Sequence, residues 1–192
     1  MESPVGGERC GLSEVLSRRF VALTAPLLAV VGLATCARAG EMLKPGDAFP
    51  SFTLSAHDGV MVKSADLAGS RYLLYCSTTA DNPGCTMEAC ALRDSWAEAQ
   101  MLGLKVFGVS YDTPADNQAF ADKYGLQFPL LSDTERKLAE AVGAAGAMGF
   151  PSRISYLGGA DGWVLKAYPK VTPAEHAAEV IADLKTLAPA KG

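Results

Sequence analysis

Short apolar runs alternate with amphipathic segments along the chain from residue 40 onward. Such alternation is typical of an α/β domain, in which buried strands are covered by helices. The pattern predicts two hairpins, 52–54 with 60–62 and 154–157 with 163–167, and further strands at 72–75, 106–109 and 128–131. It predicts helices at 82–100, 114–124, 134–142 and 173–187.

Glycine and proline set the limits of several of these elements. Gly103 and Gly125 follow two of the helices, as residues that end a helix often do. Pro129 has no N–H to donate, which favours an edge strand for 128–131. Residues 189–192 should fray at the chain end. No linker or internal repeat divides the chain after residue 39, so a single domain over 40–192 is expected.

Residues 1–39 have the pattern of an export signal. Arg18 and Arg19 precede an uncharged apolar stretch over 21–36, and the sequence Ala-Arg-Ala at 37–39 is a small-x-small cleavage pattern before Gly40. We expect cleavage and delivery to the periplasm or an equivalent lumen, by the twin-arginine or the general route. Two alternatives are an uncleaved membrane anchor and lipidation at Cys36.

Composition narrows the classes of partner. The chain is 49% hydrophobic and 20% charged, as in soluble globular proteins, and its formal net charge is −4. An acidic balance argues against nucleic acid or an anionic membrane as a partner. We expect a monomer without a stable membrane partner.

Cysteine usage indicates redox chemistry rather than a disulfide scaffold. Of five cysteines, Cys10 and Cys36 lie in the predicted signal, which leaves Cys76, Cys85 and Cys90 in the domain. An odd number fits one redox pair and a spare thiol. Cys76 follows an apolar run and is interpreted as a buried small hydrophobe, with a role as a second resolving thiol as the alternative.

The stretch from Asn82 to Arg93 carries the candidate chemistry. Asn82 is a favoured N-cap and Pro83 a favoured first helical residue, which places Cys85 in the first turn of a helix. Free amides and the helix dipole there favour the thiolate, the nucleophilic form of cysteine. Cys90 lies five residues further on, at a Cα separation of roughly 8.6 Å in a regular helix. Disulfides need Cα atoms within about 7 Å, so a bond between the two requires local unwinding.

The motif resembles the active-site helix of the Q-type peroxiredoxins, the bacterioferritin comigratory proteins. The similarity covers about residues 41–188 and rests on the stretches 83–86, 88–90, 92–94, 108–110, 123–133 and 153–157. It implies a thioredoxin-like fold of the peroxiredoxin type, with a central mixed sheet flanked by helices.

The resemblance also implies a reaction. Cys85 would be the peroxidatic cysteine, attacking hydrogen peroxide or a small organic hydroperoxide and becoming a sulfenic acid. Cys90 would resolve it as an intramolecular disulfide, and a thioredoxin-like protein would reduce that bond, with no cofactor. Arg153 stands at the family's active-site arginine and would stabilise thiolate and peroxide.

Two positions depart from the family's pattern. Thr78 stands where proline is usual and Asn82 where threonine is usual, both in the peroxide pocket that Pro83 and Gly84 would also line. The Asn82 amide could donate a hydrogen bond to peroxide. These departures leave an alternative function, a peroxide-sensing or non-catalytic redox binding module. A thiol-disulfide oxidoreductase is disfavoured because Cys-x-x-Cys is absent.

Other charged residues and the histidines are interpreted as surface features outside the site. Glu88 and Arg93 match the family but form a pattern usual for a solvated helix surface. His57 is expected in a turn and His176 on a helix surface, and neither has a partner at metal-ligand spacing. No metal site is predicted.

Overall fold

The computed structural model describes residues 40–146 and 148–187. The predicted export signal at 1–39 and the predicted fraying end at 189–192 lie outside this part of the chain. Its strands are β1 (Thr53–Ala56), β2 (Met61–Lys63), β3 (Arg71–Cys76), β4 (Leu104–Ser110), β5 (Leu130–Ser132), β6 (Ser155–Gly158) and β7 (Val164–Tyr168). Its helices are the short 3-10 helix η1 (Ser64–Leu67), α1 (Pro83–Asp94), α2 (Trp96–Met101), α3 (Pro114–Tyr124), α4 (Lys137–Ala141) and α5 (His176–Thr186).

The strands form one mixed sheet in the order β2-β1-β5-β4-β3-β6-β7. β4 pairs in parallel with β3 on one side and β5 on the other, and all the other pairings are antiparallel. The sheet and its helices confirm the predicted central mixed sheet flanked by helices.

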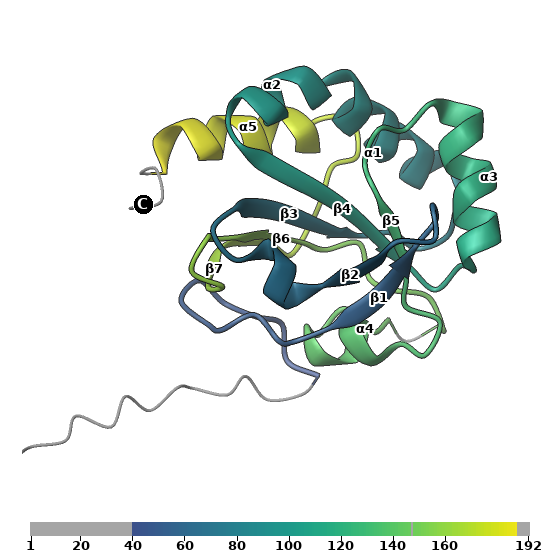
Figure 1. Ribbon diagram of the computed structural model, residues 1–192, viewed down its shortest axis with the longest axis horizontal. Coiled ribbons are helices and arrows are strands. Elements are labelled where there is room, and N and C mark those ends of the chain that lie inside the picture. The colour runs from purple at the N-terminus through teal and green to yellow at the C-terminus, as the bar shows by residue number, and fades with distance from the viewer. Residues whose placement is uncertain (1–39, 147, 188–192) are drawn as a thin grey trace, which may run out of the picture. The chain divides into compact units, whose positions relative to one another are not determined.

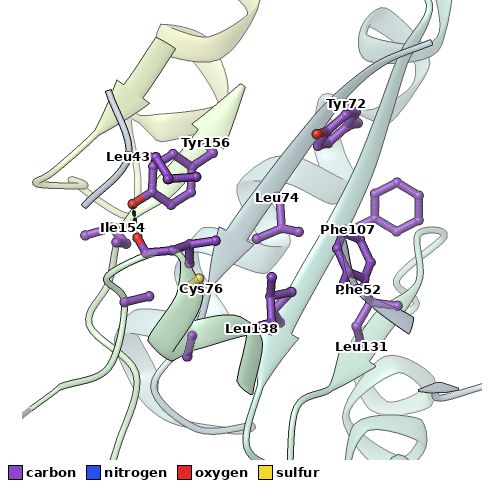
Figure 2. Close-up of a cluster of buried hydrophobic side chains, with 14 of the residues drawn as sticks. Leu43, Phe52, Tyr72, Leu74, Cys76, Phe107, Leu131, Leu138, Ile154 and Tyr156 are labelled. Carbon is purple, nitrogen blue, oxygen red and sulfur yellow. Dashed lines mark hydrogen bonds between the residues drawn. The ribbon is translucent and has the colours of Figure 1, made fainter. Parts of the chain in front are cut away.

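Helices cover both faces of the sheet (Figure 1). Residues of β3 alternate between two hydrophobic clusters, with Leu73 and Tyr75 on the face covered by α1, α2, α3 and α5. Leu74 and Cys76 point to the other face, which packs against α4 and the segment after it (Figure 2). On that second face the Tyr156 hydroxyl donates to the Val142 carbonyl. This alternation buries β3 on both sides, directly before the loop that leads to α1.

Capping and turn residues in the sequence set the ends of some helices and strands. α3 spans Pro114–Tyr124 as predicted, because the Thr113 side chain caps its first turn and Gly125 ends it in the left-handed region at φ 62°. Both predicted hairpins form, as β1 with β2 and β6 with β7.

Three predictions about elements were wrong. The helix predicted over 82–100 is interrupted at Ser95, whose φ and ψ are −92° and 3°. The helix predicted from residue 134 begins at Lys137, since Arg136 is left-handed and Asp133 accepts hydrogen bonds from the first turn. β5 is an interior strand, because Pro129 precedes it and uses only its carbonyl, which accepts from Gly108 N–H.

No helix within 40–146 and 148–187 is long and apolar enough to cross a membrane.

Candidate active site

The start of α1 has the geometry that the sequence predicts. Asn82 is extended, at φ −71° and ψ 136°, and its side-chain oxygen accepts from Gly84 N–H at 3.0 Å. Pro83 is the first helical residue. Cys85 therefore lies in the first turn, where free N–H groups and the helix dipole stabilise an anion. Capping occupies the Asn82 side-chain oxygen, so its amide nitrogen is the polar end that the cap does not use.

The loop between β3 and α1 is tied to its neighbours on both sides. Asp81 takes the left-handed conformation at φ 62°, and its carboxylate accepts from Lys123 Nζ at 2.7 Å and Tyr124 Oη at 2.6 Å. Ala80 N–H donates to Asp112 Oδ2 at 2.7 Å. These bonds hold the loop against α3 and the end of β4, which fixes the residues that face Cys85.

The side chains of Thr78 and Arg153 lie close to the sulfur of Cys85. Thr78 Oγ1 lies 3.0 Å from Sγ, and Arg153 Nη2 lies 3.4 Å from it. A thiolate can only accept, so the Thr78 hydroxyl is the donor when Cys85 is ionised. Gly84 makes room for the arginine, because a Cβ at that position would come within 2.7 Å of Arg153 Nη2. The structure thus brings together Cys85, Thr78, Gly84 and Arg153 from the sequence prediction.

The environment favours the thiolate. Burial of Cys85 alone would raise its pKa, but hydrogen bonds from the Ser77 and Thr78 side chains and the Thr79 backbone, with the charge of Arg153, outweigh burial and lower the pKa. Cys76 shows the opposite result, since burial raises its pKa to about 12. Cys76 also lies on the other face of the sheet, which supports its interpretation as a core residue.

The prediction that Glu88 and His176 are surface residues was wrong. Both are fully buried, and Glu88 Oε2 lies 3.4 Å from Arg153 Nη1. Arg153 therefore stands between two acidic groups, Cys85 and Glu88. Sequence reasoning also missed Ser77, although a polar pair directly after an apolar strand is a signal that could have pointed to Ser77 and Thr78.

The cysteines Cys76, Cys85 and Cys90 are free, with Cys90 partly exposed on α1. α1 is continuous from Pro83 to Asp94, so the folded helix corresponds to the reduced protein. Among residues 40–146 and 148–187, no group of three or more His, Cys, Asp or Glu side chains is arranged to hold a metal ion.

Comparison with known proteins shows the family of this chain. Residues 45–167 match the AhpC/TSA family. Peroxiredoxin Bcp of Escherichia coli K12 is 37% identical over 150 residues, which cover 74% of this chain and 96% of that protein.

Solved structures of similar proteins share the fold. Peroxidoxin BcpB of Mycobacterium tuberculosis aligns with a TM-score of 0.71 and 28% identity, covering 77% of this chain and 99% of that one. The bacterioferritin comigratory protein of Xanthomonas campestris, described for its alkyl peroxide reduction activity, aligns with a TM-score of 0.69 and 29% identity over 78% of this chain and 98% of that one. With a cysteine at the mouth of α1 held by Thr78 and Arg153, the chain belongs to the AhpC/TSA family and is a peroxiredoxin similar to the Bcp and Q-type proteins.

Proposed function

We propose that the protein reduces hydrogen peroxide and small organic hydroperoxides with Cys85 as the peroxidatic residue. The observation that carries the proposal is the position of Sγ, at the start of α1 and between the Thr78 hydroxyl at 3.0 Å and the Arg153 guanidinium at 3.4 Å. A thiolate held by a hydrogen bond and a positive charge is a nucleophile ready at neutral pH.

In the first step, the thiolate attacks the terminal oxygen of the peroxide. The sulfur lone pair forms an S–O bond, the O–O bond breaks, and its electron pair leaves on the second oxygen, which takes up the proton released from the attacked oxygen. The products are Cys85 sulfenate, or sulfenic acid after protonation, and water or an alcohol. In this proposal Arg153 and the N–H groups of the first turn stabilise the developing charge, and the Asn82 amide nitrogen, which the cap does not use, is a further candidate donor.

Burial limits which peroxides can react. Cys85 is 1% exposed, so a peroxide reaches the sulfur only when a neighbour moves aside. Pro83 is exposed, and the Arg153 side chain is 20% exposed. Movement at this rim, formed with Thr78 and Gly84, admits a small molecule more readily than a bulky one. The activity described for the X. campestris relative supports alkyl peroxides as substrates.

Cys90 is the proposed resolving residue. In regular helix geometry its Cα lies roughly 8.6 Å from that of Cys85, beyond the about 7 Å that a disulfide allows, so the first turns of α1 unwind for the sulfurs to meet. The protein then acts as an atypical 2-Cys peroxiredoxin. A thioredoxin-like dithiol protein attacks the disulfide, and two exchange steps restore both thiols while the reductant leaves oxidised.

Turnover separates this function from a peroxide-sensing or non-catalytic redox module. Purified protein with thioredoxin, its reductase and a peroxide should consume peroxide continuously, and Cys85→Ser should consume none above background. Equal rates for the two proteins would refute the proposal. The sensing alternative is not favoured, because Thr78, one of the two residues that motivated it, contacts the sulfur directly.

Export remains a proposal that rests on the sequence of residues 1–39. Cleavage before Gly40 would release the domain to the periplasm or an equivalent lumen, where a dedicated dithiol protein must supply electrons. N-terminal sequencing of the protein isolated from its producing cells tests this, and an intact Met1 on a membrane-bound protein would favour the uncleaved anchor instead.

A further inference from the structure

Glu88 lies on α1 between Cys85 and Cys90, in the segment that unwinds for disulfide formation. Its side chain is 0% exposed. Oε2 has one long contact, 3.4 Å from Arg153 Nη1, and Oε1 has no hydrogen-bond partner. A buried carboxylate with one long ion pair and an unpartnered oxygen is less stable than the same group in water. That unfavourable free energy applies to the folded form of α1 and disappears when the segment unwinds.

The unpartnered oxygen of Glu88 faces a second unpartnered group, from α5. His176 Nε2 lies 3.9 Å from Oε1, too far for a hydrogen bond. His176 is 0% exposed, and neither of its ring nitrogens has a partner. Its ring packs edge-on against the Tyr168 ring at a centroid distance of 5.0 Å, which keeps the imidazole in place. α5 therefore offers Glu88 a polar neighbour without a full bond.

Other titratable groups lie near the pair on each packed element. They are Cys85 on α1, Tyr75 on β3, Arg153 before β6, Lys166 and Tyr168 on β7, and Glu179 and Asp183 on α5, with Cys76 of β3 on the far face of the sheet. The cation on β7, Lys166, is held by Asp183 at 2.6 Å. Of these two cations, Arg153 is the one that contacts Glu88, and its guanidinium also contacts the sulfur of Cys85.

We propose that Glu88, buried against His176, is a positioning residue that promotes delivery of oxidised Cys85 to Cys90, because its ionised carboxylate favours the unwound form of α1. The inference rests on the proposed function, since it concerns the resolving step. In that step Cys90 sulfur attacks Cys85 sulfur, the S–S bond forms, the S–O bond breaks, and the leaving oxygen takes the Cys90 proton. One sulfenic acid and one thiol thus become one disulfide and one water.

The sign of the effect follows from where Glu88 loses its proton. Burial raises the pKa of Glu88 to about 7, with Arg153 opposing the rise. In the unwound segment the pKa returns to an ordinary value of about 4.3. Glu88 ionisation therefore favours unwinding increasingly as the pH rises from about 4.3 to about 7, and contributes nothing at lower pH. Each unit of difference in pKa changes the unwinding equilibrium about tenfold.

The test compares disulfide formation in the full chain with that in Glu88→Gln, which keeps the shape and removes the charge. Reduced protein is oxidised with one equivalent of hydrogen peroxide between about pH 4 and pH 8. Samples are quenched with acid, and sulfenic acid and disulfide are measured by peptide mass spectrometry. The ratio of the wild-type rate of disulfide formation to the variant rate cancels the titration of Cys90 itself.

We expect this ratio to be near one at the acid end and to rise to tenfold or more at about pH 8. A control, Glu98→Gln, removes a carboxylate that is 45% exposed and paired with Lys185 on α5. Its ratio should stay near one at every pH. A flat or falling ratio for Glu88→Gln would overturn the proposal.

His176→Leu tests the α5 side of the contact. Removing the imidazole leaves Glu88 in a more apolar site and raises its pKa in the folded helix, so the rise in disulfide formation should begin at the same pH but continue to higher pH and reach a larger ratio. In the Glu88→Gln background, His176→Leu should have no such effect. A rise that levels off at the same pH and the same ratio in His176→Leu as in the wild type would overturn the role of His176. A wild-type protein that forms no Cys85–Cys90 disulfide would refute the proposed function, whereas a disulfide formed with a flat ratio would refute only this inference.

Discussion

Replacing Thr78 by valine removes the hydroxyl that contacts the Cys85 sulfur and little else. Valine and threonine have nearly the same shape, so the loop held by Asp81 and Asp112 should keep its course. The 3.0 Å contact between Thr78 Oγ1 and Cys85 Sγ is lost. The thiolate of Cys85 then keeps its contact with Arg153 and the hydrogen bonds from its other neighbours.

The size of the effect follows from the strength of that contact. A hydrogen bond to a charged group contributes about 1.5–3 kcal/mol, which corresponds to a rise of about 1–2 units in the pKa of Cys85. Once that pKa exceeds 7, the thiolate fraction at pH 7 falls about tenfold per unit, and the greater nucleophilicity of a more basic thiolate restores part of the rate. We expect a rate of reaction with peroxide about 3- to 10-fold lower at pH 7, with most of the loss recovered at higher pH.

The pKa is measured from the pH dependence of Cys85 alkylation, followed on the peptide that contains it. Thr86→Val is a matched control, because it makes the same chemical change beside Cys85 at a hydroxyl that has no hydrogen-bond partner. The control should leave the pKa of Cys85 unchanged. An unchanged pKa in Thr78→Val, or equal shifts in both variants, would show that the hydroxyl does not stabilise the thiolate.

Three further predictions concern other parts of the site. Gly84→Ala should displace Arg153, whose Nη2 would lie 2.7 Å from the new Cβ, and lower the rate with peroxide by about tenfold or more, although alanine favours the helix. Unchanged stopped-flow rates would contradict this. Cys76→Ala should leave turnover unchanged and lower the free energy of unfolding by about 1 kcal/mol, and a loss of turnover would instead place Cys76 in resolution. Burial lowers the pKa of His176 to about 4, so as the pH falls below about 6.5 the histidine takes up a proton in the unfolded protein before it does so in the folded one. By about pH 5, denaturant titrations should therefore show that the free energy of unfolding has fallen by about 2 kcal/mol more in the wild type than in His176→Gln. Equal losses in the two proteins would contradict a neutral buried imidazole.

Local chemistry made several elements predictable from the sequence. The first turn of α1 and the whole of α3 are set by capping residues, prolines and glycines that act on the residues beside them. The hairpins follow from apolar runs joined by turn residues. The position of Cys85 at the mouth of a helix belongs to this group, and so does the cap that Asn82 forms with Gly84 N–H.

Contacts between distant segments could not be predicted in this way. The break at Ser95 has no glycine or proline to mark it. Glu88 and His176 are both polar and lie on different helices, and their burial depends on how α1 packs against α5. A single sequence gives helix periodicity but not which polar residue faces another helix. The resemblance to peroxiredoxins identified Arg153, whereas its second partner, Glu88, required the structure.

The most direct test of the central claim is to map the bond that forms when the reduced protein meets one equivalent of hydrogen peroxide. Peptide mass spectrometry should find a disulfide between Cys85 and Cys90, with Cys76 still a free thiol. In Cys90→Ser the same treatment should stop at the Cys85 sulfenic acid, which further peroxide converts to sulfinic acid. An unoxidised Cys85 in the wild type, or a disulfide that contains Cys76, would contradict the account.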